Sequence, residues 1–169
     1  MDQILSKKLY EIPLKLKLLC FLTVLNLTIG VAIGLYYVGY TTDFTSIGTL
    51  EHYNGSKVDN TFDIPEKYPK PISELLNTTH THVISMTFIF LILGTIFFFN
   101  SIITGIFKTI FIVEPFLSII ITFGGIWLIR FVNPLFSYVV IFSGILMYLS
   151  FFIMAFTIFY ELTIKGKSM

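Results

Sequence analysis

Long uncharged, mostly apolar runs alternate with short polar segments along this chain. Three of these runs hold 25, 33 and 30 residues between consecutive charges, and the stretch between Lys108 and Arg130 contains one charge, Glu114. A helix needs roughly 20 apolar residues to cross the hydrocarbon core of a bilayer, and helices satisfy their own backbone polar groups there. The pattern therefore predicts an all-α integral membrane four-helix bundle. The helices are expected near 17–40, 80–100, 108–130 and 134–160.

Composition supports this interpretation and excludes several other classes of protein. Of the 169 residues, 55% are apolar and 12% are charged, and the mean hydropathy is +0.85. Soluble domains carry about 25% charged residues. The 11 basic residues nearly cancel the 10 acidic ones, so no nucleic-acid partner is expected. The single cysteine excludes an internal disulfide. We expect one membrane domain over residues 1–169, with the lipid bilayer as its partner.

The distribution of lysines predicts the orientation. Four spans place the N-terminal lysines, Lys108 and the C-terminal lysines on one side of the membrane, whereas the 39-residue loop 41–79 has six acidic and three basic residues. The positive-inside rule then puts both termini in the cytoplasm and the loop outside. The loop is expected to lie over the bundle mouth as irregular structure. Ser73 followed by Glu74 is typical of a helix start, so an alternative start of the second helix lies near residue 73.

Small and weakly polar residues mark helix contacts in membranes better than apolar residues do. The third helix has such a stripe, which predicts its inward face: Glu114, Ser118, Thr122 and Gly125. The first helix has another, including a Gly-x-x-x-Gly pair: Thr23, Asn26, Gly30 and Gly34. Both stripes are expected to face the other helices.

All three histidines fall on the predicted outer side. His52 lies in the loop, and His80 and His82 flank one residue where the second helix enters the membrane. Residues two apart on a helix point about 200° from each other, so one rigid helix aims only one of this pair inward; His80 is the expected one. Neutral imidazole is a good ligand for zinc, copper or haem iron. The alternative is that these histidines only bond loop backbone at the interface.

Two further charges stand out near the membrane. Glu114 lies six residues after Lys108, within the expected inner leaflet, and is followed by Pro115. Acidic residues at such depth usually face a partner or a cavity. Glu114 is therefore a candidate for proton uptake or ion binding, or else a structural partner of a lysine or of Asn26 in the first helix. Arg130 ends the third helix on the outer side, where it is expected to anchor the helix to the acidic loop or lipid phosphates.

Two short motifs carry a resemblance to a known group of proteins. The loop contains His52-Tyr53-Asn54-Gly55, and the second helix opens on Thr79-His80-Thr81-His82. In these motifs the chain resembles small four-helix inner-membrane proteins of bacteria that have a His-Tyr-x-Gly loop and a Thr-His-x-His helix entrance. The resemblance implies a bacterial inner-membrane location and singles out His52, His80 and His82. It implies no particular activity.

Three functions follow from these features. The first is an outward histidine site built by His80, His82 and His52, which binds haem b or a copper or zinc ion in a respiratory or metal-handling context. The second is an accessory or scaffold subunit without its own chemistry, docked in a larger membrane complex. The third is a small proton-coupled transporter that uses Glu114 and forms a homo-oligomer to enclose a pathway. The sequence shows no nucleophile–histidine pair of the kind that hydrolases use.

Overall fold

The computed structural model describes residues 8–57 and 64–165, and all regular structure within them is helical. The helices of this described part are η1 (Leu9–Glu11), α2 (Leu14–Thr42), α3 (Ser46–Asn54), α4 (Ile72–Phe98), α5 (Gly105–Phe131) and α6 (Phe136–Thr163). Four of them are long and apolar enough to cross a membrane, namely α2, α4, α5 and α6. The predicted all-α class and the four spans are confirmed.

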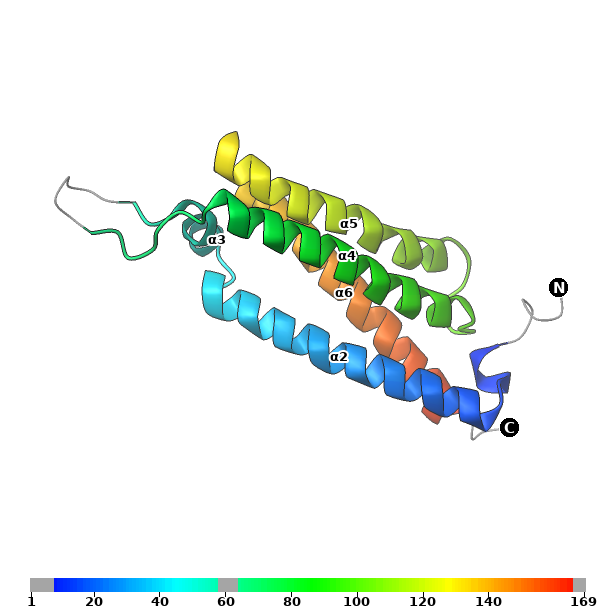
Figure 1. Ribbon diagram of the computed structural model, residues 1–169. Helices are drawn as coiled ribbons and strands as arrows, with labels where there is room; N and C mark the ends of the chain where they lie inside the picture. The colour runs from blue at the N-terminus through cyan, green and yellow to red at the C-terminus, as the bar shows by residue number, and fades with distance from the viewer. Residues whose placement is uncertain (1–7, 58–63, 166–169) are drawn as a thin grey trace.

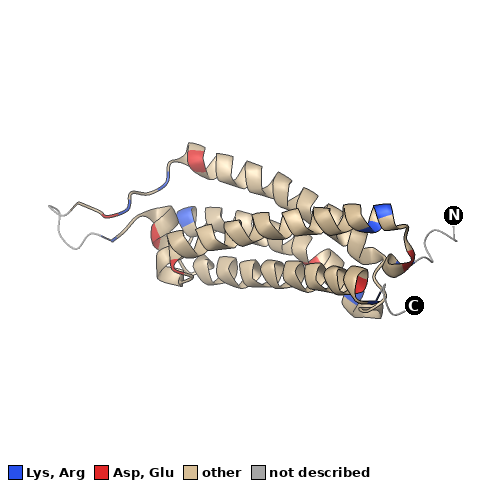
Figure 2. Ribbon diagram, turned by 90° about the horizontal axis from the view of Figure 1, so that it is seen from below, with Lys and Arg blue, Asp and Glu red and all other residues tan. Residues whose placement is uncertain are grey.

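The long helices run side by side, and the chain enters and leaves the bundle at the same end (Figure 1). We call this the terminal end, and the opposite end, which carries α3, the loop end. Charged residues gather at these two ends and leave the middle of the bundle largely uncharged (Figure 2). A charged side chain is costly inside the hydrocarbon core of a bilayer, so a largely uncharged middle suits a helix bundle that spans the membrane.

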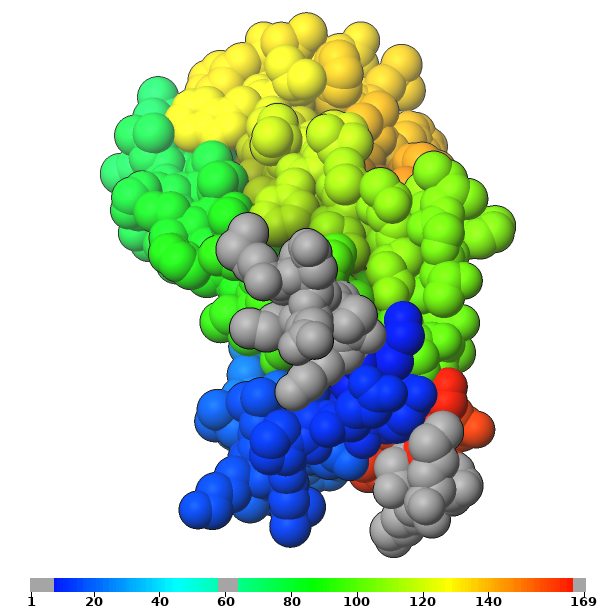
Figure 3. Space-filling model, turned by 90° about the vertical axis from the view of Figure 1, so that its right-hand side faces the viewer, coloured from blue at the N-terminus to red at the C-terminus, as the bar shows by residue number. Residues whose placement is uncertain are grey.

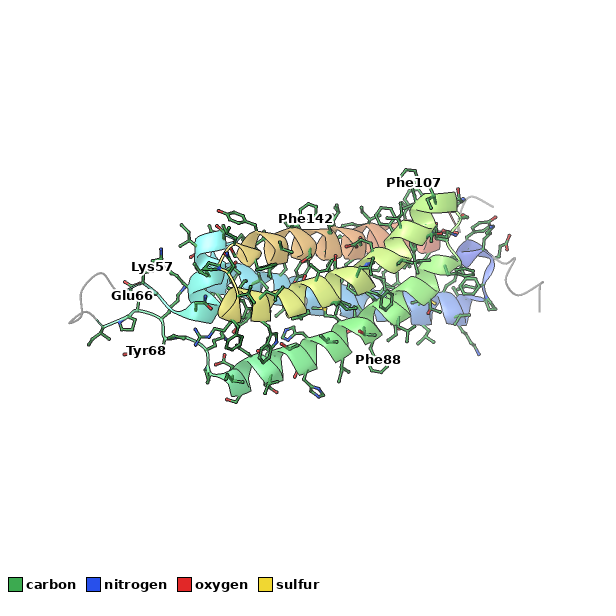
Figure 4. The ribbon with its side chains drawn as sticks, turned by 90° about the horizontal axis from the view of Figure 1, so that it is seen from above. Lys57, Glu66, Tyr68, Phe88, Phe107 and Phe142 are labelled. Carbon is green, nitrogen blue, oxygen red and sulfur yellow. The ribbon has the colours of Figure 1, made fainter. Side chains whose placement is uncertain are left out.

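The core of the bundle lies between α4, α5 and α6. α5 and α6 share the most extensive contact, α4 packs on both, and among the spanning helices α2 lies mainly against α6. Aromatic side chains of the opposite faces project away from the bundle, as Phe88, Phe107 and Phe142 show (Figure 4). Exposed apolar side chains of this kind suit contact with lipid, because acyl chains are as apolar as the side chains themselves.

The small-residue stripe of α2 is not the buried contact face that was predicted, since Thr23 and Gly34 are only half-buried. Asn26 and Gly30 are exposed, whereas Val24 and Val31 are buried. A side chain at Gly30 or Gly34 would meet no other atom within 4 Å. The buried side of α2 carries the two valines instead, and Phe21 of this helix packs against Phe159 of α6, with ring centroids 5.2 Å apart. In α5, by contrast, Ser118, Thr122 and Gly125 are buried as predicted.

The connection between α2 and α4 is partly helical, where irregular structure was expected. α3 packs on α2, α5 and α6 at the loop end, and α4 begins at Ile72, close to the start allowed near 73 and well before 80. Beyond α3 the described part of the connection extends away from the bundle, as Lys57, Glu66 and Tyr68 show, and does not lie over it (Figure 4).

The turn from α2 into α3 is tight. Asp43 and Phe44 both have positive φ angles, 52° and 53°. The hydroxyl of Thr45 accepts a hydrogen bond from the backbone N–H of Gly48 (2.9 Å), which caps α3. A Cβ at Gly48 would lie 2.0 Å from the carbonyl oxygen of Thr42. Only glycine fits at this position.

Gly48→Ala is therefore expected to lower the free energy of unfolding by about 2 kcal/mol, because the new methyl group meets backbone that cannot move aside cheaply. Thermal unfolding of the purified protein in detergent would measure the change. Gly30→Ala, at an open helical position, is the matched control and is expected to leave stability within about 1 kcal/mol or to raise it. Equal melting temperatures for the two variants would contradict the tight turn.

Candidate functional site

The structure places the three histidines in different surroundings at the loop end. His52 is on α3, and His80 and His82 are on the first turns of α4. His80 is exposed, and His82 is half-buried toward α5, with its ring centroid 5.1 Å from that of Phe123. As expected, only one of the pair turns inward. The expectation that it is His80 is wrong, because the contact with Phe123 sets the rotation of α4.

His82 is held by its own helix. Its Nδ1 atom lies 2.9 Å from the carbonyl oxygen of Thr78. A carbonyl only accepts hydrogen bonds, so Nδ1 carries the proton and the Nε2 atom of the neutral ring keeps its lone pair. Metal-binding histidines commonly have this arrangement, with the non-ligating nitrogen bonded to a backbone carbonyl. Thr79 lies about one helical turn before His82 on α4, and its hydroxyl accepts a hydrogen bond from Nε1 of Trp127 on α5 (2.9 Å). This hydrogen bond connects α5 to α4.

His52 is half-buried beside Tyr53, with ring centroids 4.9 Å apart. Its pKa is lowered from 6.5 to about 4, first by burial and then by the positive charges of Lys70 and Lys67; Glu74 acts weakly in the opposite direction. The ring is therefore neutral at pH 6, a state in which it is able to bind a metal ion. Lys67 and Lys70 themselves pair with Glu51 (4.0 Å) and Glu74 at the base of the loop.

The low pKa of His52 makes the stability of the loop end pH-dependent. Between pH 6.5 and pH 4 the unfolded chain binds a proton at His52 that the folded protein does not, so folding becomes less favourable as the pH falls through this window. We expect NMR titration of the His52 ring to give a midpoint near pH 4. In His52→Gln this part of the pH dependence should disappear, and a wild-type midpoint near 6.5 would contradict the buried position.

No three histidine, cysteine, aspartate or glutamate side chains lie close enough to hold a metal ion within the part of the chain that the structure describes. Within these described residues, His52, His80 and His82 thus form no preformed three-residue centre. The predicted binding of haem b, copper or zinc by His52, His80 and His82 stays a prediction. Arg130 lies at the loop end of α5 and is half-buried, and its anchoring role likewise stays a prediction.

Glu114 occupies the most unusual position within the membrane-spanning segments. It lies nine residues into α5, which corresponds to a depth of about 14 Å along the helix. Both of its carboxylate oxygens accept hydrogen bonds from serine hydroxyls: Ser118 of the same helix binds Oε1, and Ser150 of α6 binds Oε2. The sequence suggested a lysine or Asn26 as its partner. The structure gives it two buried serines instead.

A second polar pair continues this line toward the loop end. Thr122 and Ser143 lie one turn beyond Ser118 and share a hydrogen bond of 2.7 Å between α5 and α6. Pro115 has no N–H to donate, so the carbonyl of Phe111 lacks its helical partner beside Glu114. The α5–α6 interface therefore contains a short polar track: Glu114, Ser118, Ser150, Thr122 and Ser143.

A buried carboxylate at the terminal end was not singled out by the sequence. Glu161 of α6 is 0% exposed, and it accepts hydrogen bonds from the backbone N–H and the hydroxyl of Ser101, both at 2.8 Å. Lys165 donates to the same hydroxyl (2.8 Å). The sequence does not point to this contact, because Ser101 lies 60 residues away from Glu161 in the chain.

Asn100 and Lys108 complete this end of the bundle. The buried Asn100 side chain accepts from the backbone N–H groups of Ile102 and Ile103 (2.9 and 2.8 Å). Lys108 donates to the carbonyls of Phe98 (3.0 Å) and Asn100 (2.7 Å), which are otherwise unpaired at the end of α4. The backbone N–H of Leu9 donates to Phe99 (2.8 Å), so the N-terminal segment lies against the same connection (Figure 3).

Comparison with known proteins adds one finding to this geometry. The family Aq_1264_TM, described as a transmembrane helical domain, matches residues 43–169. The chain belongs to this family. The matched region begins just after α2 and contains α3, α4, α5 and α6, and thus Glu114 and all three histidines. No curated protein and no solved structure matches the chain.

Proposed function

We propose that this membrane protein binds and releases a proton at Glu114 and couples this to transport. The observation that supports the proposal is the carboxylate within the membrane that accepts hydrogen bonds from Ser118 and Ser150 on two different helices. Ionisable groups within transmembrane helices commonly mark proton relays or ion pathways. Glu114 also lies in the part of the chain that matches the family.

The serines suit a site that changes its protonation state. A hydroxyl donates to a carboxylate, and after rotation it accepts from a carboxylic acid, so both states of Glu114 keep their hydrogen bonds. The Thr122–Ser143 pair extends this arrangement by one turn toward the loop end. Further toward that end, α5 buries Ile126 and Ile129. A complete pathway therefore requires a second conformation of the bundle or a second copy of the chain.

Two measurements test this function. The infrared carboxyl band of the purified protein reports the protonation of Glu114 as pH is changed, and a pH-sensitive dye in proteoliposomes reports proton movement. In Glu114→Gln we expect both the Glu114 band and the proton movement to be lost, because the amide keeps the shape but does not titrate. Glu161→Gln, which changes the buried carboxylate at the terminal end, is the matched control. Unchanged proton movement in Glu114→Gln would overturn the transport function.

A second candidate function is the outward histidine site. It is supported by His82, whose Nε2 atom keeps its lone pair while Nδ1 is bonded to Thr78. The test is a visible absorption spectrum together with metal analysis of gently purified protein. His82→Ala should lose bound haem, copper or zinc, whereas His80→Ala, which changes an exposed ring, should lose less. Wild-type protein that contains neither haem nor metal would contradict this function.

The accessory-subunit alternative is favoured by α2. This helix lies outside the matched domain, little of it is buried within the bundle, and Asn26 and Gly30 are exposed on it. Polar and small residues on a lipid-facing surface commonly pack against another helix. Purification in mild detergent, followed by mass measurement of the intact particle, would show a larger complex or homo-oligomer if α2 has such a partner. A monomer would contradict it.

For orientation, we propose a bacterial cytoplasmic membrane with the terminal end in the cytoplasm. Lysines favour this side: Lys8, Lys15, Lys17, Lys108 and Lys165 all lie at the terminal end, with two glutamates, Glu11 and Glu161. The positive-inside rule relates this excess to the cytoplasmic face. Labelling of single introduced cysteines by a membrane-impermeant reagent in intact cells would test it, and labelling at residue 57 but not at residue 15 is expected.

A further inference from the structure

An apolar groove lies between α4 and α5 in the half of the bundle nearest the terminal end. Its volume is about 330 Å³, and it is lined mainly by aromatic and aliphatic side chains, among them Phe90, Phe98, Ile112 and Phe116. Gly94 forms its floor: the residue is buried, yet a Cβ atom built on it would meet no other atom within 4 Å. The groove is therefore a real hollow in the lipid-facing wall.

The groove has the dimensions of an acyl chain in one leaflet. From Phe90 to Phe98 the helix rises by about 12 Å, and half of the hydrocarbon core is about 15 Å thick. One end of the groove therefore lies near the middle of the membrane. The other end lies at Phe98 and Phe99, where the polar connection between α4 and α5 begins.

Two lysines, Lys108 and Lys8, lie at that polar end of the groove. Lys108 donates to the carbonyl oxygens of Phe98 and Asn100, and an ammonium group has three N–H donors, so one remains for another acceptor. The Leu9–Phe99 backbone hydrogen bond places Lys8 beside the same residues. Figure 3, which faces this end, shows the N-terminal segment next to the α4–α5 region. Basic residues at a membrane surface attract anionic lipid headgroups.

We propose that this groove binds one anionic phospholipid, with an acyl chain between α4 and α5 and its phosphate against Lys108 and Lys8. The apolar hollow supplies the site for the chain, and the two lysines supply the preference for negative charge. The site is separate from Glu114, whose partners lie on the α5–α6 side of the bundle. Lipid binding here does not depend on the proton function proposed above.

Lipid retention by the full-length protein tests the proposal. Delipidated protein in detergent is incubated with equal amounts of phosphatidylglycerol and phosphatidylcholine that carry the same chains, and native mass spectrometry counts the lipids that stay bound. We expect one phosphatidylglycerol per chain, and a preference over phosphatidylcholine that falls about fivefold when either lysine is changed to glutamine. Lys108→Arg should keep the preference.

Two glycines provide the matched pair for the groove itself. Gly94→Leu adds a side chain at a position where a Cβ atom has open space, so it should fill the hollow and abolish retention, whereas Gly124→Leu adds the same side chain at an open, exposed position of α5 and should not. Lys8→Gln keeps the test valid if Lys108→Gln fails to fold. Equal retention of the two lipids, retention by Gly94→Leu, or displacement of the lipid by inorganic phosphate alone would each overturn the proposal.

Discussion

Replacing Glu161 with leucine is expected to lower the free energy of unfolding by about 3–5 kcal/mol. The carboxylate is fully buried and accepts two hydrogen bonds from Ser101, which joins α6 to the connection between α4 and α5. A hydrogen bond to a charged group contributes about 1.5–3 kcal/mol, and the leucine would leave a backbone N–H and a hydroxyl without their partner. Equilibrium unfolding in mixed micelles would measure the loss.

The matched control is Glu74→Gln. Glu74 is exposed and pairs with Lys70 at the loop end, so its replacement should change stability by less than about 1 kcal/mol. The loss of stability in Glu161→Gln should lie between these two losses. The glutamine amide keeps one oxygen that accepts a hydrogen bond from Ser101, but its NH₂ group cannot accept the second one. If Glu161→Leu and Glu74→Gln unfolded alike, the buried carboxylate would contribute nothing to holding the helices together.

The second large effect is expected for Ser150→Ala, at about 2–3 kcal/mol. This change removes the hydroxyl that α6 donates to Glu114 and leaves one carboxylate oxygen without its partner inside the membrane. Ser143→Ala is the matched control on the same helix. Its hydroxyl pairs with the neutral Thr122, so a loss of only about 1 kcal/mol is expected. Unfolding in mixed micelles again measures both variants.

A double-mutant cycle would show that the loss of stability in Ser150→Ala comes from its hydrogen bond to the Glu114 carboxylate. When Glu114 is already replaced by leucine, Ser150→Ala should cost less by about 1–2 kcal/mol, since the two residues interact directly. The cost of Ser143→Ala should be almost the same in both backgrounds. Additive losses of stability for Glu114→Leu and Ser150→Ala would mean that the hydrogen bond between these residues does not stabilise the fold.

The four spans are predictable from the sequence because each depends only on a local property, a run of apolar residues longer than the membrane is thick. The inward face of α5 is predictable for a similar reason: Ser118, Thr122 and Gly125 repeat along one side of the helix. α3 is harder to foresee, since it is nine residues long and its start depends on the Thr45 cap and on the close approach of Gly48 to Thr42.

The sequence does not reveal how each helix is rotated about its own axis or which distant residues its side chains contact. The spacing of His80 and His82 shows that only one turns inward, but the contact of His82 with Phe123 on another helix determines which. One of the two partners of Glu114, Ser150, likewise lies 36 positions away, and Ser101, the partner of Glu161, lies 60 positions away. For α2, a Gly-x-x-x-Gly pair indicates that a close contact is possible, and not which helix supplies it.

The pairing of α2 with α6 has a consequence for how the protein is made. Residues of α2 emerge from the ribosome about a hundred positions before those of α6, yet α6 is its main partner among the spanning helices. During synthesis α2 must therefore remain in the bilayer without its main spanning partner, in contact with α3 and α4, until α6 inserts. Because contacts between distant parts of a chain form slowly, closure of the bundle by α2 is expected to be a late step of its biogenesis.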